Sequence, residues 1–537
     1  MASLIDYSSF FDYVSSAIGA DNVSRDGSSG ALAGPSGQTA YGDLYPLGVE
    51  RGKAPVGGVR PQTVQEVQDV LRAANKFGVP LWVVSRGKNL GYGGTAGVLS
   101  SSVTLDLHRM NRIIEINEEL AYAIVEPGVS FFDLYEEVTR RKLKLWPSVP
   151  AIGWGSVVGN TLDRGFGYTP DGEHASAQCG MEVVLPNGEV MRTGMGAMTD
   201  SKLFALYKPG FGPSVDGLFY QSNLGIVTKI GIQMTPAPEA FCSVTVSVSE
   251  EADLVSLVDK LGDLMRRRII TNSPSVSNVF RQLVVCPDPE VVAETKKLVA
   301  QDKAVPYETL EALRKRFGWG FWKADFALYG TPEIVHAQLQ AVQRAFAPLA
   351  GARVVSKFFA SSPAGALSAR DIGPEEIPHA GMPTLAPLMM MNSRGVGCGH
   401  ISFSPLIPPC GRDMYEWYLA AKAMTSAARF DFFADFHVYP RYIIAINLVV
   451  FADAERDRVH GLFRQLLDDG EARGYSEYRT HVSFMDEVAK HFDFNNGALR
   501  RFVGSIKDMV DPNHILSPGK SGIWGSAVHN VPARTIE

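Results

Sequence analysis

The sequence predicts an α+β protein with two or three domains. At 537 residues the chain is too long to fold around a single core. Three small-residue or glycine-rich stretches in the first half lie beside β-branched residues, as loops next to buried strands do. From about Glu239 amphipathic helical patterns alternate with strands, which is typical of an open sheet backed by helices.

The individual elements follow from caps and periodicity. Thr63 is a favourable N-cap and Glu66 completes a capping box, so a helix is predicted to start at residue 64 and end at Gly78. Strands are then predicted at 102–107 and 121–125, and a helix at 131–140. In the second half, the predicted helices are 253–268, 332–349 and 454–470, and the predicted strands are 243–248, 400–405 and 442–451.

The stretch 80–94 is a short apolar run followed by a loop that contains Gly87, Lys88, Asn89, Gly91, Gly93 and Gly94. Glycine residues let several backbone N–H groups point at one phosphate. Most glycine-rich loops are simple turns, however, and this one matches neither the G-x-G-x-x-G nor the Walker lysine motif of nucleotide-binding proteins. Related stretches at 152–160 and 222–228 indicate a ligand too long for one loop, and the proline- and glycine-rich stretch 511–524 is predicted to return to the first domain as an ordered loop. The alternative from pattern alone is a β-rich domain with several tight turns.

Composition excludes several classes of protein. The net charge is only −6 and no basic tract occurs, so no nucleic-acid partner is expected. No apolar run is long enough to span a bilayer, and the N-terminus lacks a basic segment, so neither membrane insertion nor secretion is expected. The five cysteines show no paired spacing, which fits a reducing compartment, and the predicted location is cytoplasmic.

Eight stretches, taken in this order along the chain, form a sequence pattern that is specific for one protein family: 87–94, 125–129, 153–165, 181–197, 211–231, 399–405, 477–486 and 511–524. Together they resemble the vanillyl-alcohol oxidase family of flavoenzymes, whose members oxidise para-substituted phenols. The resemblance covers nearly the whole chain from about residue 60. It implies a discontinuous FAD-binding domain of the PCMH type, residues 1–240 plus 495–537, and an α+β cap domain, residues 241–494, for the substrate.

The resemblance also implies the FAD-binding residues. They are Arg86, Gly87, Lys88, Asn89, Gly91, Gly93, Gly153, Ser156, Val157, Gly159, Asn160, Gly225, Ile226, Val227 and Lys520. His400 matches the family's covalent histidine, and no second tether residue is found, so one bond to the flavin 8α carbon is expected. Without the family, a histidine beside a strand would be interpreted as a structural residue.

Tyr92, Tyr478 and Arg479 match the family residues that bind the phenolic oxygen. A phenol releases a hydride from its para substituent only when it is close to phenolate, and a cation with two hydroxyl donors favours that form. Without the resemblance, Tyr478 and Arg479 would be interpreted as a surface pair and Tyr92 as a packing aromatic.

Glu173 departs from the family pattern, because relatives carry aspartate in a G-D-H motif near flavin N5. Its carboxylate is expected to stabilise the developing quinone methide and to accept a proton from attacking water. In the alternative, the longer side chain turns away, toward His174 or Arg164, and Asp171 or a water replaces it. Substrate range and rate depend on which arrangement holds.

The expected activity is that of a covalent FAD oxidase of 4-alkylphenols, 4-hydroxybenzyl alcohols and allylphenols, with O2 as acceptor and H2O2 as product. A serine run at 100–102, where relatives tend to have glycine, leaves open a dehydrogenase that passes electrons to a cytochrome. A flavin-binding protein without turnover and a carbohydrate oxidase are further alternatives. The presence of the trio Tyr92, Tyr478 and Arg479 argues against the first, and the lack of a second residue for a covalent flavin bond argues against the second. No metal site is expected. The protein is expected to form a homodimer or a higher homo-oligomer.

Overall fold

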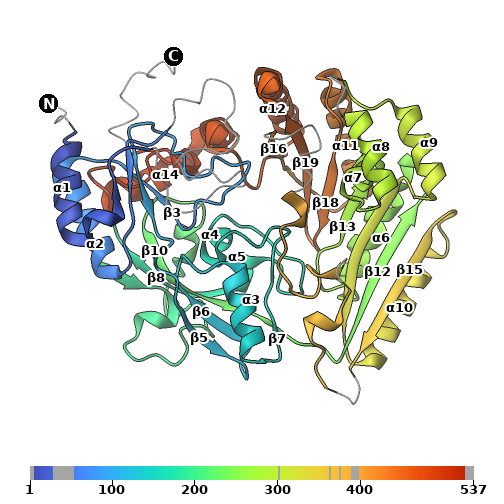
Figure 1. The fold of residues 1–537 in the computed structure, drawn as a ribbon, viewed down its shortest axis with the longest axis horizontal. Coiled ribbons are helices and arrows are strands. Elements are labelled where there is room, and N and C mark those ends of the chain that lie inside the picture. The colour runs from blue at the N-terminus through green and yellow to red at the C-terminus, as the bar shows by residue number, and fades with distance from the viewer. Residues whose placement is uncertain are drawn as a thin grey trace.

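The computed structural model describes residues 5–27, 54–299, 303–361, 365–373, 376–388 and 398–525. Its strands form four-, five- and eight-stranded sheets and one two-stranded pair. In Figure 1 the larger part of the eight-stranded sheet lies on the right, and the smaller sheets lie on the left with the last helix. Helices and sheets are therefore both major components, which confirms the predicted α+β class.

Four sets of strands are defined by their pairing. The four-stranded sheet, in the order β1-β2-β4-β3, contains β1 (Val23–Ser24), β2 (Gly57–Val59), β4 (Val103–Asp106) and β3 (Leu81–Val84). The five-stranded sheet contains β5 (Ile113–Asn117), β6 (Tyr122–Val125), β10 (Ile226–Gln233), β8 (Gln178–Val184) and β9 (Val190–Arg192). The two-stranded pair is β11 (Thr235–Pro236) with β7 (Leu145–Trp146). The eight-stranded sheet contains β15 (Arg353–Ala360), β12 (Ala240–Val248), β14 (Trp322–Gly330), β13 (Ser275–Asn278), β18 (Ala434–Val438), β19 (Ile443–Phe451), β16 (Gly399–Phe403) and β17 (Leu406–Ile407).

The α-helices occur in both halves of the chain. Those of the first half are α1 (Tyr7–Ile18), α2 (Val64–Phe77), α3 (Phe131–Arg140), α4 (Val157–Leu162) and α5 (His174–Ala177). The later ones are α6 (Leu254–Arg266), α7 (Val279–Val285), α8 (Pro289–Val299), α9 (Tyr307–Phe317), α10 (Pro332–Phe346), α11 (Gly411–Ala427), α12 (Arg456–Ala472), α13 (Met485–Lys490) and α14 (Phe494–Val510). The predicted helices 131–140, 253–268, 332–349 and 454–470 correspond to α3, α6, α10 and α12.

Helix α2 shows how local chemistry sets an element. The Thr63 hydroxyl accepts from the Glu66 N–H at 3.1 Å, as predicted, and Gly78 ends the helix in the left-handed region at φ 68°. The reciprocal bond goes elsewhere, since the Glu66 carboxylate accepts from the N–H of Gln62 at 2.7 Å. The N-cap Thr63 was thus predicted correctly, whereas the Glu66 carboxylate binds the backbone of Gln62, one residue before the N-cap.

The end of the chain returns to the first sheet. Leu81, in β3, donates its N–H to Ile515 O and accepts from Ser517 N–H, both at 2.7 Å. Ile515 and Leu516 join the apolar cluster that α1 and α2 form with the four-stranded sheet. The predicted return of the closing stretch is confirmed over these residues, while residues 526–537 lie outside the described part of the chain.

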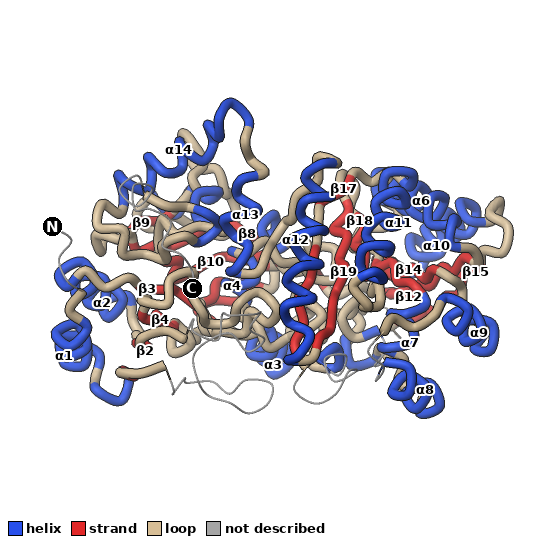
Figure 2. Tube along the Cα trace, turned by 90° about the horizontal axis from the view of Figure 1, so that it is seen from above, coloured by secondary structure: helices blue, strands red, loops and turns tan. Residues whose placement is uncertain are grey.

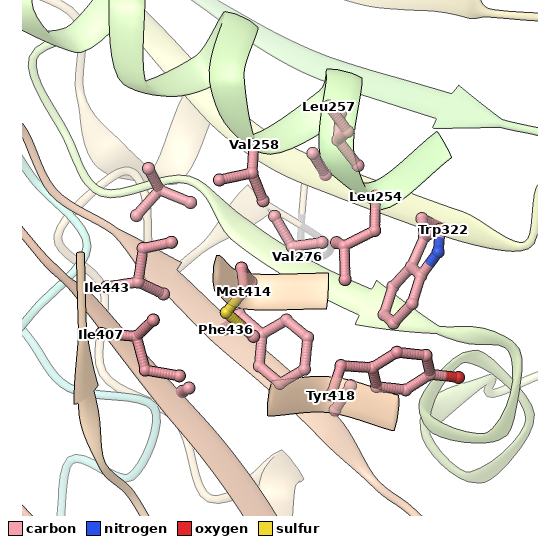
Figure 3. Packing of buried hydrophobic residues seen from close by; sticks show 14 of the residues in the cluster. Leu254, Leu257, Val258, Val276, Trp322, Ile407, Met414, Tyr418, Phe436 and Ile443 are labelled. Atoms are coloured by element: carbon pink, nitrogen blue, oxygen red, sulfur yellow. The ribbon is translucent and has the colours of Figure 1, made fainter. Parts of the chain in front are cut away.

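The eight-stranded sheet has two chemically different faces. Helices α6, α10, α11 and α12 pack on one face, and Figure 2 shows α6, α10 and α11 close together along it. Alternate residues such as Val276, Trp322 and Phe436 enter this apolar core, as Figure 3 shows. The residues between them face the opposite way, toward the glycine loops. This open sheet backed by helices matches the prediction, and its polar face forms one wall of the candidate site.

Candidate active site

A cavity of about 350 Å³ lies between the glycine loops and the polar face of the eight-stranded sheet. The glycine side comes from the loop after β3, where Gly87, Gly91 and Gly93 have positive φ values of 65°, 79° and 113°. A Cβ atom at Gly91 would lie 2.5 Å from His400 Nε2, and one at Gly93 would lie 2.6 Å from Val482. Only glycine therefore lets this loop approach the sheet and the segment after Arg479 so closely.

Most of the predicted FAD-binding residues border this cavity. Those that line it are Arg86, Gly87, Lys88, Asn89, Ser156, Gly159, Asn160, Gly225, Ile226, Val227 and Lys520, together with His400. Gly91, Gly93, Gly153 and Val157 are not among the lining residues. Gly91 and Gly93 instead provide the close packing described above, and a Cβ at Gly153 would lie 2.3 Å from Pro383. The structure thus brings three distant stretches of sequence to one site.

The basic residues of the site have protein partners of their own. Arg86 Nη1 donates to Gly128 O at 2.7 Å, and Lys520 Nζ lies 2.8 Å from Asp163 Oδ1. Lys88 lies over the Trp154 ring at 4.6 Å, and burial lowers the pKa of its ammonium to about 8. A phosphate anion near Lys88 would raise this pKa again, because an opposite charge offsets desolvation.

Two features of the second glycine-rich stretch fit a bound flavin dinucleotide: open space beside Gly155 and a fixed Asn160 side chain. Gly155, in the second glycine-rich stretch just before α4, has nothing within 4 Å of the position that a Cβ would take, and it lines the cavity. Asn160 is held by His174, whose Nδ1 lies 2.7 Å from Asn160 Oδ1 and whose Nε2 lies 3.0 Å from Ser148 Oγ. Burial lowers the pKa of His174 to about 3, so this ring is neutral and acts as a fixed support.

His400 lies on β16, and strand alternation explains its direction. Ile401 and Phe403 enter the apolar core, while His400 and Ser402 line the cavity. The His400 side chain is buried, and its Nε2 faces the glycine loop at Gly91. The histidine predicted to carry the flavin therefore lies in the cavity wall and is part of the same loop–sheet contact.

Tyr92, Tyr478 and Arg479 come together as predicted. The Arg479 guanidinium carbon lies 4.1 Å from the Tyr92 ring centroid and 5.4 Å from that of Tyr478. Val482 donates its N–H to Tyr92 O at 3.2 Å, and Gln221 Nε2 donates to Tyr478 O at 2.7 Å. The three side chains line the cavity, and these two hydrogen bonds hold the backbones of Tyr92 and Tyr478.

The positive charge of Tyr92, Tyr478 and Arg479 comes from the Arg479 guanidinium. Among the described residues no carboxylate lies within ion-pair distance of Arg479, and its buried Nε has no hydrogen-bond partner. Burial raises the pKa of the adjacent Glu477 to about 8, so this carboxyl is largely neutral at pH 7. Burial also raises the pKa of Tyr478 well above its ordinary value, which keeps its hydroxyl protonated. The site can therefore accept an anion.

Glu173 lies beside the site but is not among the residues that line the cavity. Its carboxylate accepts a hydrogen bond from the Tyr442 hydroxyl, and neither His174 nor Arg164 takes that place. Tyr442 stacks on Tyr439 with ring centroids 4.7 Å apart, which connects Glu173 to the aromatic cluster around Tyr478. Asp171 is also occupied, since it accepts from Thr235 Oγ1 at 2.8 Å.

The cavity contains further side chains that the sequence did not identify. The main ones are Asp163, Phe166, Tyr168, Ser402, Asp435 and Ile446. Asp435 is the carboxylate on the sheet side, and it accepts from Ser275 Oγ at 2.8 Å and pairs with Arg281 at 3.3 Å. The alternation of polar and apolar residues at 434–438 would have indicated a strand with Asp435 and His437 on one face.

Comparisons with known proteins support these observations. Residues 55–194 match the family model described as "FAD binding domain". The chain is 36% identical over 477 residues, covering 88% of both chains, to the 4-cresol dehydrogenase [hydroxylating] flavoprotein subunit of Pseudomonas putida.

Two solved structures resemble the whole chain. The 4-ethylphenol oxidase from Gulosibacter chungangensis, in an isoeugenol complex, matches with a TM-score of 0.87 at 33% identity over 97% of both chains. A p-cresol methylhydroxylase with substrate bound matches with a TM-score of 0.86 at 33% identity over 96% of both chains. In the described ranges, no helix has the length and apolarity that a membrane span requires.

The similarity to the Pseudomonas putida subunit and to the two solved structures extends over nearly the whole chain. The chain therefore belongs to the vanillyl-alcohol oxidase family of FAD-dependent oxidoreductases.

Proposed function

We propose that this protein catalyses the FAD-dependent oxidation of para-substituted phenols, including 4-alkylphenols, 4-hydroxybenzyl alcohols and allylphenols. One observation carries the proposal: Arg479 is a half-buried cation in the cavity wall with a buried Nε, flanked by Tyr92 and Tyr478 and without an ion-pair partner among the described residues. A phenolate oxygen supplies the missing charge and accepts from both hydroxyls. The names of the similar proteins, which include a 4-cresol dehydrogenase and a 4-ethylphenol oxidase, point to the same class of substrate.

The proposed division of labour follows the two sides of the cavity. Residues 1–240 plus 495–537 would bind FAD through the three loops, and residues 241–494 would supply the sheet face over the substrate. The three basic residues near the loops, Arg86, Lys88 and Lys520, line the cavity where the phosphates would bind. His400 would form the single covalent bond to the flavin 8α carbon.

In the proposed reaction, Tyr92, Tyr478 and Arg479 hold the phenol oxygen and lower its pKa. Bound FAD supplies the hydride acceptor. Loss of a hydride from the benzylic carbon of the phenolate leaves a neutral p-quinone methide. Water then adds its hydroxyl to that carbon, and the remaining proton returns to the phenol oxygen. Glu173 would offset the positive character at the benzylic carbon and relay the water proton.

We propose O2 as the electron acceptor, with H2O2 as product, and a cytochrome as the alternative. The similar proteins include both an oxidase and a dehydrogenase, so their names do not decide between the two. Stopped-flow mixing of the phenol-reduced protein with air-saturated buffer decides it. Rapid reoxidation with one H2O2 per flavin supports the oxidase; slow reoxidation without stoichiometric peroxide supports the cytochrome-linked enzyme.

Replacing His400 with alanine tests the proposed tether. The variant is expected to bind FAD that acid precipitation extracts, while the wild-type flavin stays with the protein pellet. Flavin reduction by 4-ethylphenol is also expected to slow, because an 8α bond withdraws electron density and raises the potential. The spectrum of the acid supernatant gives the measurement. Flavin that remains in the pellet of His400→Ala would assign the bond to another residue.

Glu173→Gln tests the proposed carboxylate. We expect single-turnover flavin reduction to slow by about a hundredfold, because a neutral amide does not offset positive character at the benzylic carbon. The Asp171→Asn variant is the matched control and should be nearly silent, since Asp171 is bonded to Thr235. Rates are compared at saturating 4-ethylphenol. A silent Glu173→Gln with a damaging Asp171→Asn would reverse the assignment.

A further inference from the structure

Asp435 is a carboxylate in the wall of the candidate site that the proposed reaction does not use. It lies on β18, where Ala434, Phe436 and Val438 enter the apolar core, as Figure 3 shows for Phe436. Asp435 and His437 alternate with these residues, so their side chains lie on the opposite face of the sheet. Asp435 thus belongs to the polar face, in the cavity where a substrate would bind.

The closest protein contacts of the Asp435 carboxylate are all made to one of its two oxygens. Oδ1 accepts from Ser275 Oγ at 2.8 Å and lies 3.3 Å from both Arg281 Nη2 and His437 Nε2. Among the described residues, none donates a hydrogen bond to Oδ2. A carboxylate has about four acceptor sites, so those on Oδ2 are left for a ligand.

The Oδ2 atom opens into the candidate site. It is not one of the enclosed polar atoms that lack a hydrogen bond, so part of its surface can be reached by a small molecule. Asp435 lines the cavity that contains Arg479, whereas Ser275 and Arg281 border a separate cavity, which Asp435 does not line. The accessible oxygen of Asp435 therefore faces the space proposed for the substrate.

The Asp435 carboxylate is ionised, and its charge is balanced within the protein. Burial disfavours the charged form, but the Arg281 guanidinium outweighs burial and holds the pKa of the Asp435 carboxyl below its ordinary value. Because Arg281 offsets the negative charge, Oδ2 does not require a cation from the ligand. It requires a hydrogen-bond donor, and a neutral hydroxyl group is sufficient.

Asp435 also lies on the same wall as the proposed site of the phenol oxygen. Its direct cross-strand partner is Ile446 on β19, and the Cβ atoms of such pairs are about 5 Å apart. Ile446 packs against the apolar cluster that contains Tyr478, and both side chains line the cavity. Asp435 and Tyr478 are therefore linked along one wall through Ile446 and this cluster.

We propose that Asp435 Oδ2 accepts a hydrogen bond from a second hydroxyl group of the substrate, while Tyr92, Tyr478 and Arg479 bind the phenolic oxygen. This inference rests on the proposed function for the position of the phenol. It assigns the protein a preference for phenols with an additional hydroxyl group, on the ring or on the para substituent, over analogues with a methyl group in its place.

Two matched pairs of phenols test the preference and distinguish the two positions. 4-Ethylcatechol and 4-ethyl-2-methylphenol differ in a ring hydroxyl against a methyl group of similar size. 3-(4-Hydroxyphenyl)propan-1-ol and 4-butylphenol differ in the same way at the end of the para substituent. Anaerobic stopped-flow gives the second-order rate constant of flavin reduction for each compound. We expect the hydroxyl compound of at least one pair to react about tenfold faster than its methyl partner; ratios near one in both pairs would overturn the proposal.

Asp435→Asn locates the effect. Because Ser275 and Arg281 keep the amide oxygen on their side, the amide nitrogen takes the place of Oδ2, and the ratio of the preferred pair should fall at least about threefold. The ratio is taken within each variant, so a loss of rate common to both compounds cancels. Asp325→Asn is the matched control and should keep the ratio, since Asp325 lies on the same sheet face, accepts from Thr245 Oγ1 at 2.7 Å and does not line the cavity.

If Asp435→Asn does not fold, the double variant Asp435→Asn/Arg281→Gln, which leaves no unpaired guanidinium, takes its place. A wild-type ratio in the folded Asp435 variant would overturn the proposal.

Calorimetry separates this inference from the proposed function. If none of these phenols reduces the flavin, the proposed function fails, and the affinities of the purified holoprotein for the four compounds then decide the inference. A Kd about tenfold lower for a hydroxyl compound than for its methyl partner, with the difference lost in the Asp435 variant, supports the hydroxyl subsite. Equal affinities within both pairs overturn it.

Discussion

Arg479→Ala is expected to lower kcat/KM for 4-ethylphenol by about a thousandfold, equivalent to about 4 kcal/mol. Arg479 is half-buried in the cavity wall, and no described carboxylate forms an ion pair with it, so its charge acts mainly on the anion that occupies the cavity. Without it, the phenol oxygen must ionise in a desolvated site between two neutral tyrosine hydroxyls. Steady-state kinetics and the absorbance change of bound phenols report the loss of ionisation.

Arg464→Ala is the matched control for this substitution. Arg464 pairs with Glu487 at 2.8 Å on the surface of α12 and does not line the cavity. Its removal should change kcat/KM by less than about twofold, because exposed ion pairs contribute little. An Arg479→Ala variant with near-normal activity toward 4-ethylphenol would show that the phenol binds elsewhere.

Lys507→Met is expected to destabilise the protein by about 3–5 kcal/mol, because it leaves a buried carboxylate without its counter-ion. The Lys507 ammonium donates to Asp511 Oδ2 at 2.6 Å and to the carbonyls of Asn223 and Leu516 at 2.8 Å. Lys507 is 1% and Asp511 0% exposed. These hydrogen bonds connect α14 to the third loop, residues 222–228, and to the closing stretch of the chain, residues 511–524.

Urea unfolding measures the change, with the exposed Lys490→Met as the control. The double variant Lys507→Met/Asp511→Asn should recover part of the lost stability, since it removes the unpaired charge. Equal unfolding midpoints for Lys507→Met and the wild type would show that the ion pair does not hold these segments together.

The sequence predicted the elements whose cause is local. Helix α3 is bounded as predicted, because Ser130 and Asp133 form a capping box within four residues. The glycine loops and the trio were located because their motifs are contiguous and resemble a family. Asp435 was not found, since its strand enters the sheet by pairing with β13, far away in sequence. Tyr168 was not found, since it lies in the loop after α4 and has no local pattern around it. The position of Glu173 was also beyond prediction, because its partner Tyr442 lies far along the chain.

The same limit applies to charge. Nothing local distinguishes the buried Lys507 from exposed lysines, since its burial depends on the third loop and the closing stretch packing around α14. A further cavity, lined by Ser275, Asp325 and Ser356, depends in the same way on strands β13, β14 and β15, which lie in one sheet. Local patterns fix where elements begin and end, whereas the environment of a side chain depends on contacts between segments far apart in sequence.

The central claim is that the cavity binds a phenol as its anion and removes a hydride from the para substituent. Anaerobic stopped-flow reduction of the flavin by 4-ethylphenol and by its methyl ether, 4-ethylanisole, tests it most directly. The two compounds share the benzylic carbon, but the ether has no ionisable oxygen for Tyr92, Tyr478 and Arg479. We expect 4-ethylphenol to bleach the flavin absorbance and 4-ethylanisole to leave it unchanged; reduction by both at the same rate would contradict the claim.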